Sequence, residues 1–273
     1  MIIQLILLVI VILHLTGASP NMYVEGFMLR YGSFLMQTRD SFVKTFITQN
    51  RWMQLLAGLG VTLLITVVAI VIGILLGFIL AAVRSTYDMT LQGRTCRTFL
   101  DYLLKVLNAI CNVYITIIRG TPVVIQLMIM YFIIFSNWRS GLFPAMLAFG
   151  LNSAAYVAEI IRSGIMSIDR GQFEASRSLG FGYFSTMIFV ILPQAIKNIL
   201  PALGNEFIVL LKETSIAGYA AVQDLTYVGN LIRSRTYEAF FPLITVAVVY
   251  LIIVLILSFL LKLLEKGLRK SER

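Results

Sequence analysis

Four polar residues recur along an apolar stretch of the sequence, residues 142–165. They stand four, three and four residues apart, a spacing that places side chains on one face of an α-helix: Asn152, Tyr156, Glu159 and Ser163. A carboxylate within such a stretch is costly in a bilayer unless it faces water or the interior of a helix bundle. We therefore expect this face to line a solute pathway, with Glu159 meeting an ammonium group or a cationic side chain.

Arg162 follows Glu159 by three residues and is within reach of it on a helix. A purely structural ion pair near the helix end is the competing interpretation of these two residues. The sequence alone leaves both interpretations open.

A second polar set lies in the irregular apolar segment 184–211, which Pro193 and Pro201 are expected to interrupt. Kinked or unwound helices build many binding sites near the midplane of transporters. The polar residues of this region are Asn198, Asn205, Glu206 and Lys212. Of these, Asn205 and Glu206 are our candidates for the pathway.

The polar stretch between these segments predicts a short helix over residues 169–180. Asp169 and Gln172 have the spacing of a capping box at a helix start. Gly180 suits the position just after a helix end, where a positive φ is needed. Glu174 lies in the first turns, near the positive end of the helix dipole. Such a helix is too short to cross a membrane, and an ordinary connecting loop is the alternative.

Several kinds of site are disfavoured by the residues that the chain lacks. The chain has two cysteines, one histidine and no Gly-Lys dipeptide, so no metal-ligand spacing and no phosphate-binding P-loop is present. We expect no catalytic residues, no metal and no bound cofactor, and hence no enzyme. The net charge of +9 comes from basic residues at the ends of apolar segments and indicates no nucleic-acid partner.

Composition places these residues in a membrane protein. Of the 273 residues, 59% are hydrophobic and 13% charged, against about 25% charged in a soluble domain. Residues 55–83 contain no charge, and about 20 apolar residues suffice to cross a bilayer. The runs are continuous and do not alternate, which disfavours a β-barrel. The sequence predicts an all-α, polytopic membrane protein.

We expect five core transmembrane helices within residues 55–265. Gly73 and Gly77 share a helix face and permit close packing. The stretch 99–135 is too long for one straight span and is broken at 119–122, which predicts an amphipathic or partly inserted helix followed by a membrane segment. Residues 1–54 form an N-terminal extension whose apolar segment, 1–16, is a candidate extra helix. Residues 266–273 form a basic tail.

Basic residues predict the orientation of the spans. The stretches 84–105, 162–177 and the C-terminal tail hold twelve Lys and Arg, against eight on the opposite side. The richer side is expected to face the cytoplasm. The short helix at 169–180 is therefore expected to be cytoplasmic.

One motif around this helix resembles the EAA motif of ATP-binding-cassette importer permeases. Glu174-Ala175-Ser176 is followed by Gly180 and then by Val190-Ile191-Leu192-Pro193, with the family's spacing. Ser176 stands where the family usually has Ala. Further segments resemble the polar amino acid branch of the family: Arg119-Gly120-Thr121-Pro122, Asn152-Ser153-Ala154-Ala155-Tyr156, Glu159-Ile160-Ile161-Arg162, Leu192-Pro193-Gln194-Ala195, Gly204-Asn205-Glu206 and Lys212-Glu213-Thr214-Ser215.

The resemblance implies roles for particular residues. The positions expected to couple the chain to an ATPase are Asp169, Gly171, Gln172, Glu174, Ala175, Ser176, Gly180, Leu192 and Pro193. The positions expected along the substrate pathway are Asn152, Tyr156, Glu159, Arg162, Asn205 and Glu206.

The resemblance also implies the function and the partners. The chain is expected to be the membrane subunit of an importer in the bacterial cytoplasmic membrane, moving a polar or charged L-amino acid. The expected partners are ATPase subunits that bind ATP and Mg²⁺, a second permease subunit (identical or paralogous) and a separate extracytoplasmic solute-binding protein. An ATP-independent carrier or channel is the alternative, and it leaves the motif at 174–193 unexplained.

Overall fold

The computed structural model describes residues 32–270, and every regular element in this range is helical. Five helical segments are long and apolar enough to cross a bilayer: Gly32–Thr90, Phe99–Gly120, Leu142–Met166, Tyr183–Ala220 and Phe240–Leu268. The prediction of an all-α membrane protein with five core spans is confirmed. The candidate extra helix at residues 1–16 lies outside the described residues, as do residues 271–273 of the tail.

The first span centres on α3 (Arg51–Thr90), a helix of 40 residues. Helical residues 32–42, a π-helical turn η1 (Val43–Ile47) and a 3₁₀ turn η2 (Thr48–Asn50) precede it. The charge-free run 55–83 ends before Arg84, but α3 continues beyond this residue. Arg84 is accommodated within the helix because it forms an ion pair with Glu159 of α6.

The predicted break in the next segment is present, but the long helix precedes the break and the short helix follows it. α4 (Phe99–Gly120) begins with a capping box between Thr98 and Asp101. Its 22 residues make it a candidate span, about 33 Å long at 1.5 Å per residue. After Pro122, α5 (Val123–Ile129) and the π-helical turn η3 (Met130–Ile134) form an apolar helix too short to cross alone. The part expected to be an amphipathic or partly inserted helix is thus long and apolar enough to span, and the part expected to be the membrane segment is too short to do so alone.

The third span, α6 (Leu142–Met166), leads into the short helix α7 (Arg170–Ser178). The chain then continues through α8 (Tyr183–Thr186), the π-helical turn η4 (Met187–Ile191), α9 (Leu192–Glu213) and the 3₁₀ turn η5 (Thr214–Ala220). This fourth span was expected to be interrupted at Pro193 and Pro201, but it stays helical throughout. Pro193 lies in the first turn of α9, where a missing N–H is tolerated. Pro201 lies inside α9, where neighbouring groups in a bundle can compensate for one lost bond.

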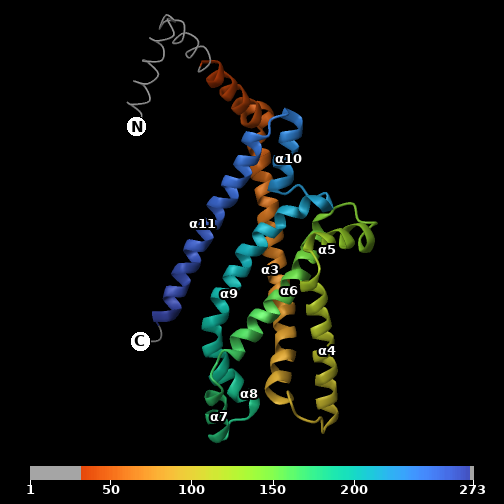
Figure 1. Ribbon diagram of the computed structural model, residues 1–273, viewed down its shortest axis with the longest axis vertical. Helices are drawn as coiled ribbons and strands as arrows, with labels where there is room; N and C mark the ends of the chain where they lie inside the picture. Colours follow the sequence, from red (N-terminus) through yellow and green to blue (C-terminus); the bar gives the residue numbers. More distant parts are fainter. Residues whose placement is uncertain (1–31, 271–273) are drawn as a thin grey trace, which may run out of the picture.

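The last two helices are α10 (Leu225–Thr236) and α11 (Phe240–Lys270). α11 includes the fifth span and continues into the basic tail expected from residue 266. Figure 1 shows α7 and the α3–α4 connection at one end of the molecule and α10 at the opposite end. Residues 84–105 and 162–177, which were counted together as cytoplasmic, therefore lie at the same end.

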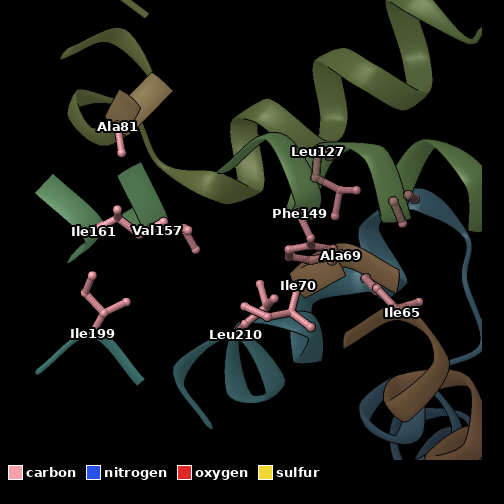
Figure 2. Close-up of a cluster of buried hydrophobic side chains, with 14 of the residues drawn as sticks. Ile65, Ala69, Ile70, Ala81, Leu127, Phe149, Val157, Ile161, Ile199 and Leu210 are labelled. Atoms are coloured by element: carbon pink, nitrogen blue, oxygen red, sulfur yellow. The ribbon is translucent and has the colours of Figure 1, made fainter. Parts of the chain in front are cut away.

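The core lies where α3, α6 and α9 meet, and α5 covers one side of it. Figure 2 shows Ile65, Ala69 and Ile70 of α3 near Phe149 of α6 and Leu210 of α9. Phe149 is the largest fully buried side chain of this region. By contrast, α11 presents most of its apolar side chains outward, as expected of a helix that faces lipid or another subunit.

α3 and α6 approach each other closely along a glycine face of α3. A Cβ atom added at Gly73 would lie 2.7 Å from Ser153 Oγ, and one added at Gly77 would lie 2.6 Å from Val157 Cγ1. The close packing predicted from the four-residue spacing of these glycines is confirmed. In a bilayer, such contacts between small residues hold helices together.

Replacing Gly77 by Ala should therefore destabilise the protein by about 1–3 kcal/mol through overpacking against Val157. Gly60→Ala is the matched control, because Gly60 lies in the same helix with no atom near its added Cβ. That change should be neutral or stabilising by up to about 1 kcal/mol. Thermal unfolding of the two variants in detergent measures the difference, and equal stabilities would contradict the packing argument.

Asp224 caps α10 from a buried position between two spans. Its carboxylate accepts hydrogen bonds from Thr226 N (2.9 Å) and Tyr227 N (3.2 Å). Burial raises the pKa of Asp224 to about 6, although these backbone donors oppose the shift. The folded chain thus holds this proton more tightly than the unfolded chain does. Its contribution to stability is complete below the unfolded pKa of 3.8 and is lost as the pH rises through about 6.

We expect Asp224→Asn to reduce the loss of thermal stability between pH 5 and pH 8, because the amide keeps a cap acceptor and has no charge to bury. Asp169→Asn is the control, since Asp169 caps α7 from an exposed position. Melting temperatures in detergent at the two pH values provide the measurement. An unchanged pH dependence in Asp224→Asn would show that other groups cause it.

Candidate functional site

The start of α7 is fixed by a side-chain cap. Asp169 Oδ1 accepts a hydrogen bond from Gly171 N at 2.6 Å. The predicted cap at Asp169 is therefore present, but it is this single bond and not the reciprocal capping box with Gln172. A Cβ atom at Gly171 would lie 2.8 Å from the same oxygen. Glycine at this position thus leaves room for the cap.

The end of α7 is fixed by a Schellman motif, in which two backbone bonds close the last turn. Gly180 has a φ of +88° and donates from its N–H to Arg177 O at 3.0 Å. Phe181 N donates to Ser176 O at 3.1 Å. The predicted left-handed glycine after the helix is confirmed. α7 is therefore closed at both ends, which limits fraying of so short a helix.

α7 has an anchored edge and an exposed face. Phe173 packs against the main core and lies 5.9 Å from the ring of Tyr183, centroid to centroid. Ser176 is buried, and its hydroxyl donates to Gln172 O at 2.7 Å. The serine that replaces the family's alanine is thus accommodated within the helix. The exposed side carries the other expected coupling residues: Gly171, Gln172, Glu174 and Ala175.

The span that follows α7 supports it from one side. η4 contacts α7, and Leu192 at the start of α9 packs against the core, whereas Pro193 is exposed. A cavity of about 630 Å³ lies between α7 and the end of α3. Its lining includes Asp88 and Arg94 from the α3 side and Phe173, Glu174 and Arg177 from α7.

A network of four charged side chains joins α3 to α6 near the same end. One oxygen of Glu159 pairs with Arg84 and the other with Arg162, the latter at 3.1 Å. Arg162 also pairs with Asp88 at 3.1 Å. The ion pair expected from the Glu159–Arg162 spacing is present. Both carboxylate oxygens of Glu159 thus have arginine partners within this chain, as the interpretation of a structural ion pair requires.

The three remaining members of the predicted stripe have other contacts. Ser163 is exposed, and its hydroxyl donates to Ile160 O at 3.0 Å. Asn152 is buried and donates through Nδ2 to Gln126 Oε1 of α5 at 3.1 Å. Tyr156 is half-buried, and the guanidinium carbon of Arg119 lies 5.3 Å from its ring centroid. Asn152 and Tyr156 thus face α5 and α4, and Glu159, nearer the end of α6, belongs to the charge network.

Asn205 and Glu206 are neighbours in sequence but lie in different surroundings. Glu206 is buried between α9 and α6 and accepts a hydrogen bond from Ser153 Oγ at 3.2 Å. Asn205 is exposed. Successive helical residues differ in direction by about 100°, so the two do not form one site within this chain.

The structure adds five residues that sequence reasoning had not assigned to the site: Arg84, Asp88, Arg119, Gln126 and Ser153. Arg84 and Asp88 stand four apart on α3, which could have indicated a shared polar face. The partners of Gln126 and Ser153 depend on how α5, α6 and α9 pack, and no local spacing predicts them.

Comparisons with known proteins agree with the motif resemblance. Residues 99–270, more than half of the chain, match the family described as "Binding-protein-dependent transport system inner membrane component". The chain is 42% identical over 166 residues to the arginine transport system permease protein ArtQ of Bacillus subtilis, covering 60% of this chain and 76% of ArtQ. It is 40% identical over 166 residues to the glutamine transport system permease protein GlnP of Escherichia coli K12, covering 59% and 76%.

The fold has a counterpart among solved structures. A crystal structure described as that of an amino acid ABC transporter with histidines superposes with a TM-score of 0.71 at 40% identity, covering 81% of this chain and 98% of the other. Motifs, span arrangement and family match thus lead to one assignment. The chain belongs to the family of inner membrane components of binding-protein-dependent transport systems.

Proposed function

We propose that the chain is the permease subunit of an ATP-binding-cassette importer that translocates a polar or charged L-amino acid. A separate extracytoplasmic solute-binding protein delivers the amino acid, and separate ATPase subunits hydrolyse the ATP. The chain itself catalyses no reaction. The proposal rests above all on α7, a short helix closed at both ends that presents an exposed face at the end rich in basic residues.

The class of substrate is supported by the relatives. ArtQ is named for arginine and GlnP for glutamine, and the solved transporter is described with histidines. These amino acids share an α-ammonium and an α-carboxylate and differ in side-chain charge. We therefore propose polar and charged amino acids as the substrate class and assign no single amino acid as the substrate.

In this proposal α7 docks on an ATPase subunit and transmits its movement to the spans. The exposed face with Gln172, Glu174 and Ala175 supplies the contact, and Glu174 pairs with a basic residue of the ATPase. The helix stays folded when the ATPase moves against it, because Asp169 caps its start, Gly180 closes its end and Phe173 anchors it to the core. The following span contacts α7 through η4, and Leu192 packs on the core at the start of α9, beside the exposed Pro193.

The remaining partners follow from the importer type. A second permease subunit, identical or paralogous, completes the pathway, and the complex lies in the bacterial cytoplasmic membrane. ATP and Mg²⁺ bind to the ATPase subunits, so this chain needs no cofactor of its own. An ATP-independent carrier is not favoured, because it gives α7 no role.

The proposed pathway runs along α6 and α9. Asn152 and Tyr156 border it on α6, and Asn205 and Glu206 border it on α9, with Asn205 directed away from this chain's core. Glu159 and Arg162 close its cytoplasmic end as members of the charge network.

Glu174→Arg should abolish co-purification of the ATPase with the permease, because placing two like charges opposite each other in an interface costs several kcal/mol of binding free energy. Arg97→Glu is the control, since it reverses an exposed charge at the same end but outside α7. The measurement is the amount of ATPase retained on the tagged permease after co-expression.

Three outcomes are informative. Loss only in Glu174→Arg supports both the importer and the docking face. Equal retention of the ATPase by both variants would show that the ATPase contact lies elsewhere on the chain. Uptake into vesicles without any ATPase contradicts the proposed function and favours the carrier.

The role of Glu159 is tested by removing its charge alone or together with that of Arg84. Glu159→Gln leaves Arg84 unpaired, which we expect to cost about 2–4 kcal/mol. Replacing Arg84 and Glu159 together by Met should restore thermal stability and uptake, while Arg162 keeps its bond to Asp88. A double variant that is stable but takes up no amino acid would instead make Glu159 a substrate-binding residue.

A further inference from the structure

Arg119 lies at the end of a span and has no acidic partner among residues 32–270. Arg119 is the penultimate residue of α4, inside the segment Phe99–Gly120. The ion pairs found between residues 32 and 270 involve Arg84, Asp88, Glu159 and Arg162 and do not include Arg119. Its described neighbour is the ring of Tyr156 at 5.3 Å.

The guanidinium of Arg119 lies near the middle of α6. Tyr156 is 14 residues from the start of that helix and 10 from its end, or about 21 Å and 15 Å along its axis at 1.5 Å per residue. Arg119 is exposed within this chain, and a charge beside the middle of a span is costly unless it faces water or another charged group. The contact with Tyr156 offsets part of this cost but leaves the positive charge in place.

The charges closest to Arg119 along α6 cancel one another. Arg84 and Arg162 are balanced by Asp88 and Glu159 within the ion-pair network. Arg119 lies outside this balanced network. The chemistry that complements it is a single negative charge supplied from outside this chain.

The backbone beside Arg119 is held in place by hydrogen bonds. Gln126 Nε2 donates to Ile118 O at 2.8 Å, to Thr121 O at 3.1 Å and to Thr121 Oγ1 at 2.8 Å. Asn152 orients the same amide by donating to its oxygen. The break between α4 and α5 is thus a fixed structure, and interrupted helices commonly form solute sites in transporters.

We infer that Arg119 binds the α-carboxylate of the translocated amino acid, with Tyr156 holding the guanidinium plane. This inference rests on the proposed function and adds a specificity-determining residue to it. A guanidinium binds a carboxylate through two parallel N–H···O bonds, which an ammonium group cannot reproduce. Because every α-amino acid has this carboxylate, such a site accepts side chains of different charge.

The test uses the permease assembled with its ATPase in vesicles, without the solute-binding protein, which would itself select for the carboxylate. Binding of L-glutamine and L-arginine is compared with binding of their decarboxylated amines, 4-aminobutanamide and agmatine. The variants are Arg119→Gln and Arg119→Lys. Arg139→Gln is the control, an exposed arginine outside the spans.

Wild type and Arg139→Gln should bind the amino acids in preference to the amines. Arg119→Gln should weaken binding of the amino acids by about 10- to 100-fold, the range for a lost charge-assisted contact, and should remove the preference. Arg119→Lys should restore part of it. ATP hydrolysis without solute serves as the check that each variant is assembled.

The failures are distinguishable. An assembled Arg119→Gln complex with unchanged affinity and preference overturns the inference and leaves the importer function intact. A loss that depends on the content of anionic lipid, with unchanged binding preference, overturns it in favour of a lipid phosphate. Wild-type vesicles that take up no amino acid when the binding protein is added would contradict the proposed function itself.

Discussion

The contact between α3 and α6 is the constraint on which the rest of the molecule depends. In hydrocarbon there is little hydrophobic force to hold two apolar helices together, so close backbone approach and interhelical polar contacts must do so. Gly73 and Gly77 permit the approach. The pairs of Arg84 with Glu159 and of Arg162 with Asp88 fix the same two helices at one end. α4 and α9 each pack against both helices, and α11 packs against α9.

This constraint also explains where charges are tolerated. Arg84 and Asp88 lie in α3 without ending it, because each has a partner on α6. Glu206 is buried and accepts a hydrogen bond from the hydroxyl of Ser153. Removing either partner would leave a polar group in an apolar medium, which is costly. Arg84, Asp88, Glu159, Arg162 and Glu206 are therefore tolerated because each has a partner on another span, whereas Arg119 is in none of these ion pairs.

Local features of the fold could be predicted from the sequence, because short-range geometry determines them. The helix break at Pro122, the left-handed Gly180 and the cap at Asp169 each follow from a residue type and its immediate neighbours. The length of α3 could not be predicted from hydropathy, which treats Arg84 as the end of a run. Its partner Glu159 is 75 residues away, and only packing brings the two together. For the same reason the stripe on α6 predicted a face but not its contacts with Gln126 and Arg119.

Asp88 connects the two parts of the site. It lines the cavity beside α7 together with Phe173 and Glu174, and it also pairs with Arg162 in the network that joins α3 to α6. Closely packed elements transmit displacement because they do not deform continuously. A movement of α7 that changes this cavity therefore acts on a side chain that holds the two central spans together. In the proposed mechanism this carboxylate links the proposed docking face of α7 to the proposed pathway, and no motif on either side identifies it.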